Sequence, residues 1–93
     1  MFTVKDVMTV CRFMENLKNK GILVVLEIVD DVPRLRVEFE EDNYNMVTKI
    51  CKDWILFNSS LVKWYEIAFS SSCFADTDGQ YWFIIALKEK RND

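Results

Sequence analysis

The chain has 93 residues, of which 51% are hydrophobic, and this favours one folded domain over a disordered chain. Its formal net charge of −3 at pH 7 argues against non-specific binding to nucleic acid or anionic membrane, which needs a positive surface. It has no histidine, which excludes Ser-His and Cys-His nucleophiles and the commonest transition-metal ligand. We therefore expect a single domain over residues 1–93 that uses no cofactor.

The three cysteines, Cys11, Cys51 and Cys73, are odd in number and form no C-x-x-C pair, which is typical of a reducing compartment. The first residues do not combine a basic stretch with the apolar run of a secretory leader. No apolar run approaches the roughly 20 residues of a membrane-spanning helix. These features predict a cytoplasmic protein that does not enter a membrane.

Residues 3–20 are expected to form an amphipathic helix. Thr3, with Asp6 three residues later, is close to a capping box, and Gly21 suits the position after the helix end. The apolar stripe that we expect to pack on a sheet comprises Val4, Val7, Met8, Val10, Cys11, Phe13, Met14 and Leu17.

A β-hairpin and a second helix are expected next. Residues 22–29 are rich in β-branched side chains, residues 30–33 read as a turn, and residues 34–40 alternate strictly between apolar and charged. A helix over residues 43–57 follows, which Asp42 or Asn43 can cap. Its apolar face comprises Tyr44, Val47, Ile50, Cys51, Trp54 and Ile55.

Two strands are expected to end the chain. Residues 61–69 also fit a helical stripe, but their aromatic and β-branched content favours a strand. Residues 76–79 form a turn signal. They resemble the start of a calcium loop but lack its later ligands, so a turn is the better interpretation. Residues 80–88 then form a strand that is apolar on both faces.

The resulting order, α-β-β-α-β-β, predicts an α+β fold of two layers, a four-stranded antiparallel sheet with both helices packed on one face. If Leu35, Val37 and Phe39 point inward, the matching inward set of every strand is uncharged and every outward set contains a charge. The expected inward residues of the other strands are Ile22, Val24, Leu26, Ile28, Tyr65, Ile67, Phe69, Tyr81, Phe83, Ile85 and Leu87.

The outward face is the first candidate site, because the chain offers no second layer to cover Trp82, Ile84 and Ala86. Tryptophan and arginine are enriched in binding hot spots. We therefore expect a protein partner on this face, with a second copy of the chain, giving a homodimer, as one version. The expected partner-binding residues of this face are Trp64, Trp82, Ile84, Arg34, Arg36 and Glu38.

An acidic end of the first hairpin is the second candidate site. It would combine Glu38, Glu40, Glu41 and Asp42, with Asp30 and Asp31 nearby. Such acids often protect a solvated strand. They can also contact a basic partner, as in a small virus- or phage-encoded antagonist that occupies a nucleic-acid-binding protein surface.

The sequence thus favours a small non-enzymatic interaction module, an adaptor or inhibitor. Two alternatives stay open. Tryptophans and arginines on one sheet face resemble RNA-binding sheets, but no RNP-like motif is present and nucleic acid is not the expected partner. A small enzyme would use Glu27, Glu66 or Cys73 in a pocket that the sequence does not reveal.

Overall fold

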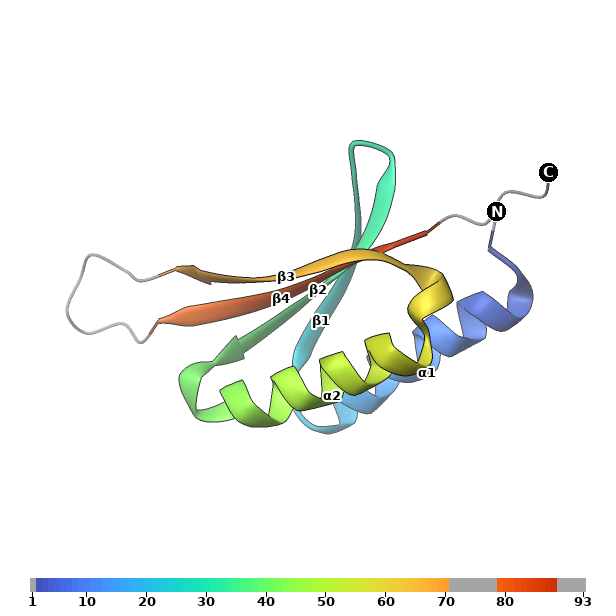
Figure 1. The fold of residues 1–93 in the computed structure, drawn as a ribbon. Coiled ribbons are helices and arrows are strands. Elements are labelled where there is room, and N and C mark those ends of the chain that lie inside the picture. The colour runs from blue at the N-terminus through green and yellow to red at the C-terminus, as the bar shows by residue number, and fades with distance from the viewer. Residues whose placement is uncertain (1, 71–78, 89–93) are drawn as a thin grey trace.

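The computed structural model describes residues 2–70 and 79–88. Its four strands form one antiparallel sheet in the order β1-β2-β4-β3, with two helices, so the predicted α+β fold is confirmed (Figure 1). The ambiguous segment 61–69 is a strand from Val62 onward, as predicted, and Leu61 ends a 3-10 turn instead. The elements are α1 (Val4–Asn19), β1 (Leu23–Val29), β2 (Val32–Glu40), η1 (Glu41–Asn43), α2 (Tyr44–Phe57), η2 (Ser59–Leu61), β3 (Val62–Ser70) and β4 (Gln80–Leu87).

Both predicted ends of α1 are present. The Asp6 amide donates to Thr3 Oγ1 at 3.1 Å, and the Thr3 amide donates to Asp6 Oδ2 at 3.1 Å, which completes the capping box. Gly21 has φ +76, and the following amide of Ile22 donates to the Leu17 carbonyl at 3.0 Å. This backbone pattern ends the helix and turns the chain into β1.

The first hairpin turns within two residues, Asp30 and Asp31, whose φ values of 51° and 65° are both positive. Two-residue turns of this kind match the right-handed twist of the strands. The predicted four-residue turn was therefore too long, because Pro33 lies inside β2. It precedes residues 34–40, which pair with β4, and so falls where a strand tolerates proline.

The predicted side-chain cap of α2 is wrong. Asn43 makes no capping hydrogen bond, and its backbone (φ −98°, ψ 2°) is not in the extended conformation typical of a capping residue. The 3-10 turn η1 leads directly into the helix instead. The apolar face of α2 is as predicted, with Val47 and Cys51 fully buried and Ile50, Trp54 and Ile55 packed against the core.

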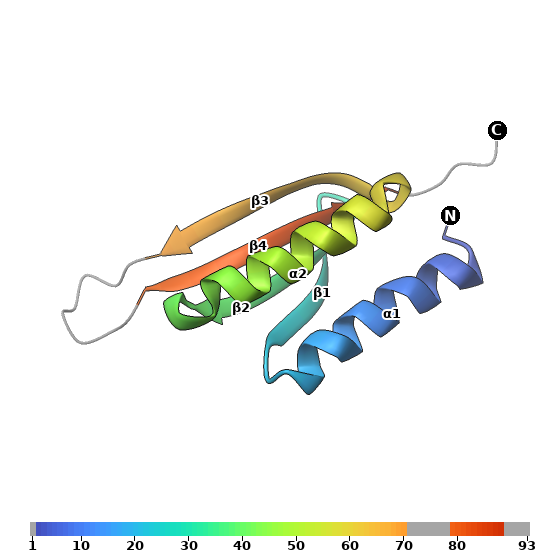
Figure 2. The same cartoon turned by 60° about the horizontal axis from the view of Figure 1, so that its bottom comes forward.

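The core lies between the sheet and the two helices. Strand register places Leu35 beside Ile85 and Val37 beside Phe83, as the predicted inward set requires. Phe13 of α1 stacks on Trp54 of α2 with ring centroids 4.5 Å apart. Both helices lie on the same side of the sheet in two views (Figures 1 and 2).

The helices cover the inward face unevenly. Leu26 and Ile28 of β1, and Tyr65 and Phe69 of β3, point inward as predicted but are exposed, Ile28 by 74%. These residues belong to the two edge strands, whereas α2 packs over the central strands β2 and β4 and α1 contacts β1 without covering Leu26 and Ile28. Cys11 is also exposed, so its predicted burial is wrong. Apolar exposure thus gathers at the edges of the sheet.

Candidate interaction surface

The outward face of the sheet is built from three cross-strand rows, each with one residue from every strand. Because the strands pair without a shift across this region, the side chains of each row are direct neighbours. In the order β1, β2, β4, β3 the rows are Leu23, Glu38, Trp82, Ala68; then Val25, Arg36, Ile84, Glu66; then Glu27, Arg34, Ala86, Trp64.

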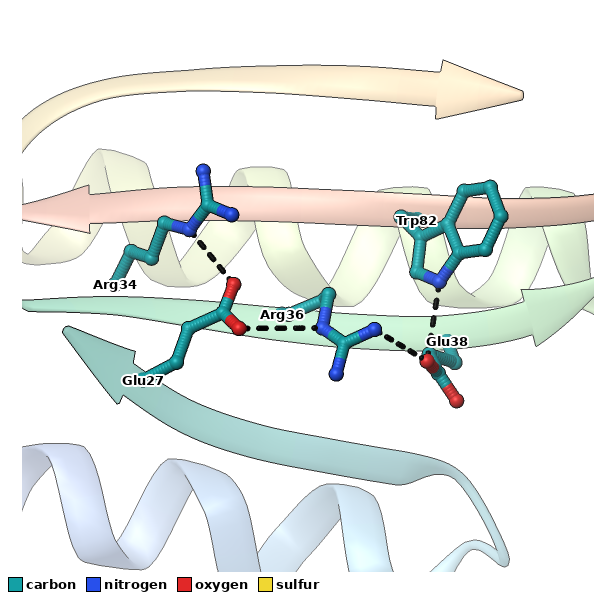
Figure 3. A network of polar contacts seen from close by, with 5 residues as sticks. All are labelled: Glu27, Arg34, Arg36, Glu38 and Trp82. Atoms are coloured by element: carbon teal, nitrogen blue, oxygen red, sulfur yellow. Dashed lines mark hydrogen bonds and ion pairs between the residues drawn. The ribbon is translucent and has the colours of Figure 1, made fainter. Parts of the chain in front are cut away.

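A polar network crosses these rows and consists of Glu27, Arg34, Arg36, Glu38 and Trp82 (Figure 3). Arg34 Nε donates to Glu27 Oε1 at 2.7 Å, and Arg36 Nη1 donates to Glu38 Oε1 at 2.8 Å. Trp82 Nε1 donates to the same Glu38 oxygen at 3.1 Å. The network joins β1, β2 and β4 and fixes the position of two arginines and a tryptophan on the solvent side.

The geometry at Arg36 is the least complete part of the network. Its Nε is buried and makes no hydrogen bond, and Glu27 Oε2 lies 3.6 Å away as an ion-pair partner. The side chains of the four charged members are only 17–33% exposed, so solvent screens these pairs less than it screens a surface ion pair.

The centre of the outward face is covered by the chain itself. Ile84 is 8% exposed and Ala86 is fully buried. Arg36 and Glu66 flank Ile84 in its row, and the long side chains of Arg34 and Trp64 flank Ala86. The expectation that these residues need a partner to cover them is therefore corrected, because long side chains can bury apolar neighbours beneath their stems.

The accessible aromatic residue of this face is Trp64. It is 40% exposed, whereas Trp82 is half-buried and hydrogen-bonded to Glu38. Of the expected partner-binding residues, Trp64, Trp82, Arg34, Arg36 and Glu38 share one surface, and Ile84 lies beneath it. The exposed side chains of the three rows are Leu23, Trp64 and Glu66, and the two arginines are partly exposed.

The acidic residues do not form one site. Asp30 and Asp31 lie at the turn end of the first hairpin, whereas Glu40, Glu41 and Asp42 lie at the other end of β2. A nine-residue strand is about 30 Å long. The expected single acidic end is therefore two separate exposed groups, and only the one over residues 40–42 has three consecutive acids.

Glu27 and Glu66 do not form a carboxylate pair. They lie on the opposite edge strands β1 and β3, three strand spacings or about 14 Å apart. Paired catalytic carboxylates lie within roughly 10 Å of each other. Glu27 is in addition paired with two arginines. Cys73 and most of the predicted turn at 76–79 lie outside the described residues.

Other chemistry is sparse in the part of the chain that the structure describes. Burial raises the pKa of the Cys51 thiol to about 12, which keeps it protonated and unreactive. Residues 2–70 and 79–88 contain no cluster of three or more acidic, cysteine or histidine side chains that could hold a metal ion. No helix within these ranges is long and apolar enough to cross a membrane.

A second surface was not anticipated. An apolar hollow of about 100 Å³ lies between α1 and the first hairpin; we call it the β1–α1 groove, and its lining includes Val7, Cys11, Met14, Leu26 and Leu87. The helix contributes positions 7, 10, 11 and 14, which lie on one side of the single broad apolar stripe that also includes the buried Phe13 and Leu17. The stripe was predicted, but no sequence signal separates the part that lines the hollow from the part that is buried in the core.

None of the protein-family models, curated proteins or solved structures compared with the chain matches it.

Proposed function

We propose that this protein is a protein-interaction module, an adaptor or inhibitor, which binds its partner through the outward face of the sheet. The observation that carries the proposal is the polar network, which holds Arg34, Arg36 and Trp82 in place beside the exposed Trp64. Binding that uses prepositioned side chains loses less conformational entropy than binding that must order them.

The types of residue on this face support the same proposal. Tryptophan and arginine are enriched among the residues that contribute most to interface energies, which cluster where the complex excludes water. Both charge signs are present in the network, so a partner of mixed charge is the better fit. A second copy of the chain satisfies this condition as well.

The size of the face sets the expected strength of binding. Four strands of seven to nine residues make a face of about 25 by 19 Å, or on the order of 500 Å². A standard interface buries about 800 Å² on each side. We therefore expect a transient complex, unless the edges of the sheet also contribute.

A second candidate function rests on the acidic group over residues 40–42. All three side chains are exposed, and none of them forms an ion pair with another described residue. Three free carboxylates in a row suit a basic protein surface, as an antagonist of a nucleic-acid-binding protein would require. In this version the salt sensitivity of binding is high.

Capture of partners from an extract of the source cells tests whether the partner binds the outward face or the acidic group over residues 40–42. Trp64→Ala and Arg34→Ala are expected to lose a partner that the wild type retains, because they remove the exposed Trp64 and the partly exposed Arg34 from the outward face. Phe57→Ala is the matched control, since Phe57 is an exposed aromatic residue on α2. A partner lost with Glu40→Lys but kept by Trp64→Ala contradicts the outward-face version and supports the acidic one.

The homodimer version needs a separate measurement. Sedimentation velocity at increasing concentration is expected to show self-association that Trp64→Ala reduces and Phe57→Ala leaves unchanged. A strictly monomeric wild type would exclude a second copy as the partner.

A further inference from the structure

We infer that the free edge of β1, together with the β1–α1 groove, binds an extended peptide segment of a partner protein as an added antiparallel strand. This surface differs from the outward face, so the inference goes beyond the proposed function.

Strand β1 has an open edge. It is the first strand in the sheet order, and its only strand partner among the described residues is β2. No other backbone hydrogen bond within the described ranges involves residues 23–29. An open edge of this kind presents a row of amides and carbonyls, and an extended backbone is the ligand that matches it.

The edge of β1 lacks the features that usually prevent strand addition. It pairs with β2 over seven residues without a bulge and has no proline or lysine, and its one charged residue, Glu27, is bound to Arg34. The opposite edge strand β3 differs, because it has a register irregularity between Val62 and Trp64 and carries Lys63 and Glu66. Charges and bulges protect an edge. The two edges therefore have different roles.

Helix α1 supplies the second half of the site. It contacts β1 and lies in the same layer as α2, where its Phe13 stacks on Trp54 (Figure 2). The helix presents Val7, Cys11 and Met14 to the groove, and β1 presents the half-exposed Leu26. A strand added to β1 would place every second side chain over this apolar wall. The ligand should therefore carry apolar residues at alternate positions.

The arrangement also favours an extended segment over a second folded copy. Pairing two β1 edges would bring the two α1 helices together, because each helix packs against its own β1. Helices need 8–10 Å between their axes, whereas paired strands are about 4.8 Å apart.

The charged residues at the two ends of β1 favour one orientation of the bound segment. The exposed Lys18 and Lys20 precede the beginning of β1, and the exposed Asp30 and Asp31 follow its end. An antiparallel segment would place its N-terminal end near the aspartates and its C-terminal end near the lysines. A segment with a basic N-terminal residue and an acidic C-terminal residue is therefore complementary in this orientation.

The test uses the capped peptide Lys-Val-Thr-Val-Thr-Val-Glu and the isotopically labelled full chain. We expect the peptide to shift the amide signals of residues 23–29 and to slow their hydrogen exchange. Exchanging the terminal Lys and Glu of the peptide should weaken binding by about threefold, the size of a surface ion-pair effect. N-methylation of the peptide amides that face β1 should abolish binding.

Two variants test the wall of the groove. Val7→Glu should weaken peptide binding at least about tenfold by placing a charge in the apolar site, and Met46→Glu, on α2, should not. Both positions are exposed, by 49% and 41%, so both variants should fold, which thermal unfolding checks. Unchanged β1 amides at millimolar peptide, shifts confined to β3, or equal binding by Val7→Glu would overturn the inference. The Trp64→Ala variant should still bind the peptide. A negative peptide result would therefore overturn the strand-addition inference without affecting the proposed function of the outward face.

Discussion

At the scale of single residues, Glu38 links Arg36 and Trp82 on the outward face. Its Oε1 accepts hydrogen bonds from both Arg36 and Trp82. Glu38→Ala should lower the free energy of unfolding by about 1–2 kcal/mol, because it leaves a partly buried guanidinium and an indole N–H without their acceptor.

Glu38→Gln is the matched control, because its amide oxygen can still accept both bonds. It should lose less than half as much stability in urea unfolding. Equal losses for the two variants would show that charge, rather than hydrogen bonding, holds the network together.

Cys51 gives a pH-dependent prediction. Burial raises the pKa of its thiol from about 9 to about 12 in the fold, so the folded state favours the protonated form. The stabilisation is present below pH 9 and is lost as the pH rises toward 12. The stability of the wild type relative to Cys51→Ala should therefore fall over this range in urea titrations. A constant difference would contradict burial of the thiol.

At the scale of elements, the first hairpin turn holds two aspartates at positive φ. A non-glycine residue in this conformation costs roughly 1 kcal/mol, which glycine avoids. Asp31→Gly should therefore raise the free energy of unfolding by about 0.5–1 kcal/mol, and Asp31→Ala should lower it. Thermal unfolding of both variants measures this. A loss of stability in Asp31→Gly would show that the aspartate side chain itself supports the turn.

The elements were predictable because local periodicity determines them. The alternation over residues 34–40 predicted which side chains face the core. Strand pairing places inward residues beside inward residues, so the same alternation holds in every paired strand. The coverage of Ile84 was not predictable, since it depends on how arginine side chains lie across neighbouring strands. Nor was the separation of Asp30 from Glu40 anticipated, although it follows from the two-residue turn and the length of β2.

At the scale of the whole molecule, the exposed large apolar side chains of the sheet lie on β1 and β3 and not on the central strands. The outward face is polar and fixed at its centre, with Trp64 at one border. The β1–α1 groove lies on the inward side, between α1 and residues of β1, β2 and β4. The two proposed binding surfaces are therefore separate, and separate substitutions should inactivate them.

The proposed function requires that a partner contacts the outward face at Trp64. Site-specific photo-crosslinking tests this most directly, with the photoreactive residue p-benzoylphenylalanine at position 64 or, as the matched control, at position 57, whose phenylalanine is 84% exposed. We expect a crosslink to another protein chain from position 64 and none from position 57. Crosslinks from position 57 alone, or from neither position in the source cells, would contradict it.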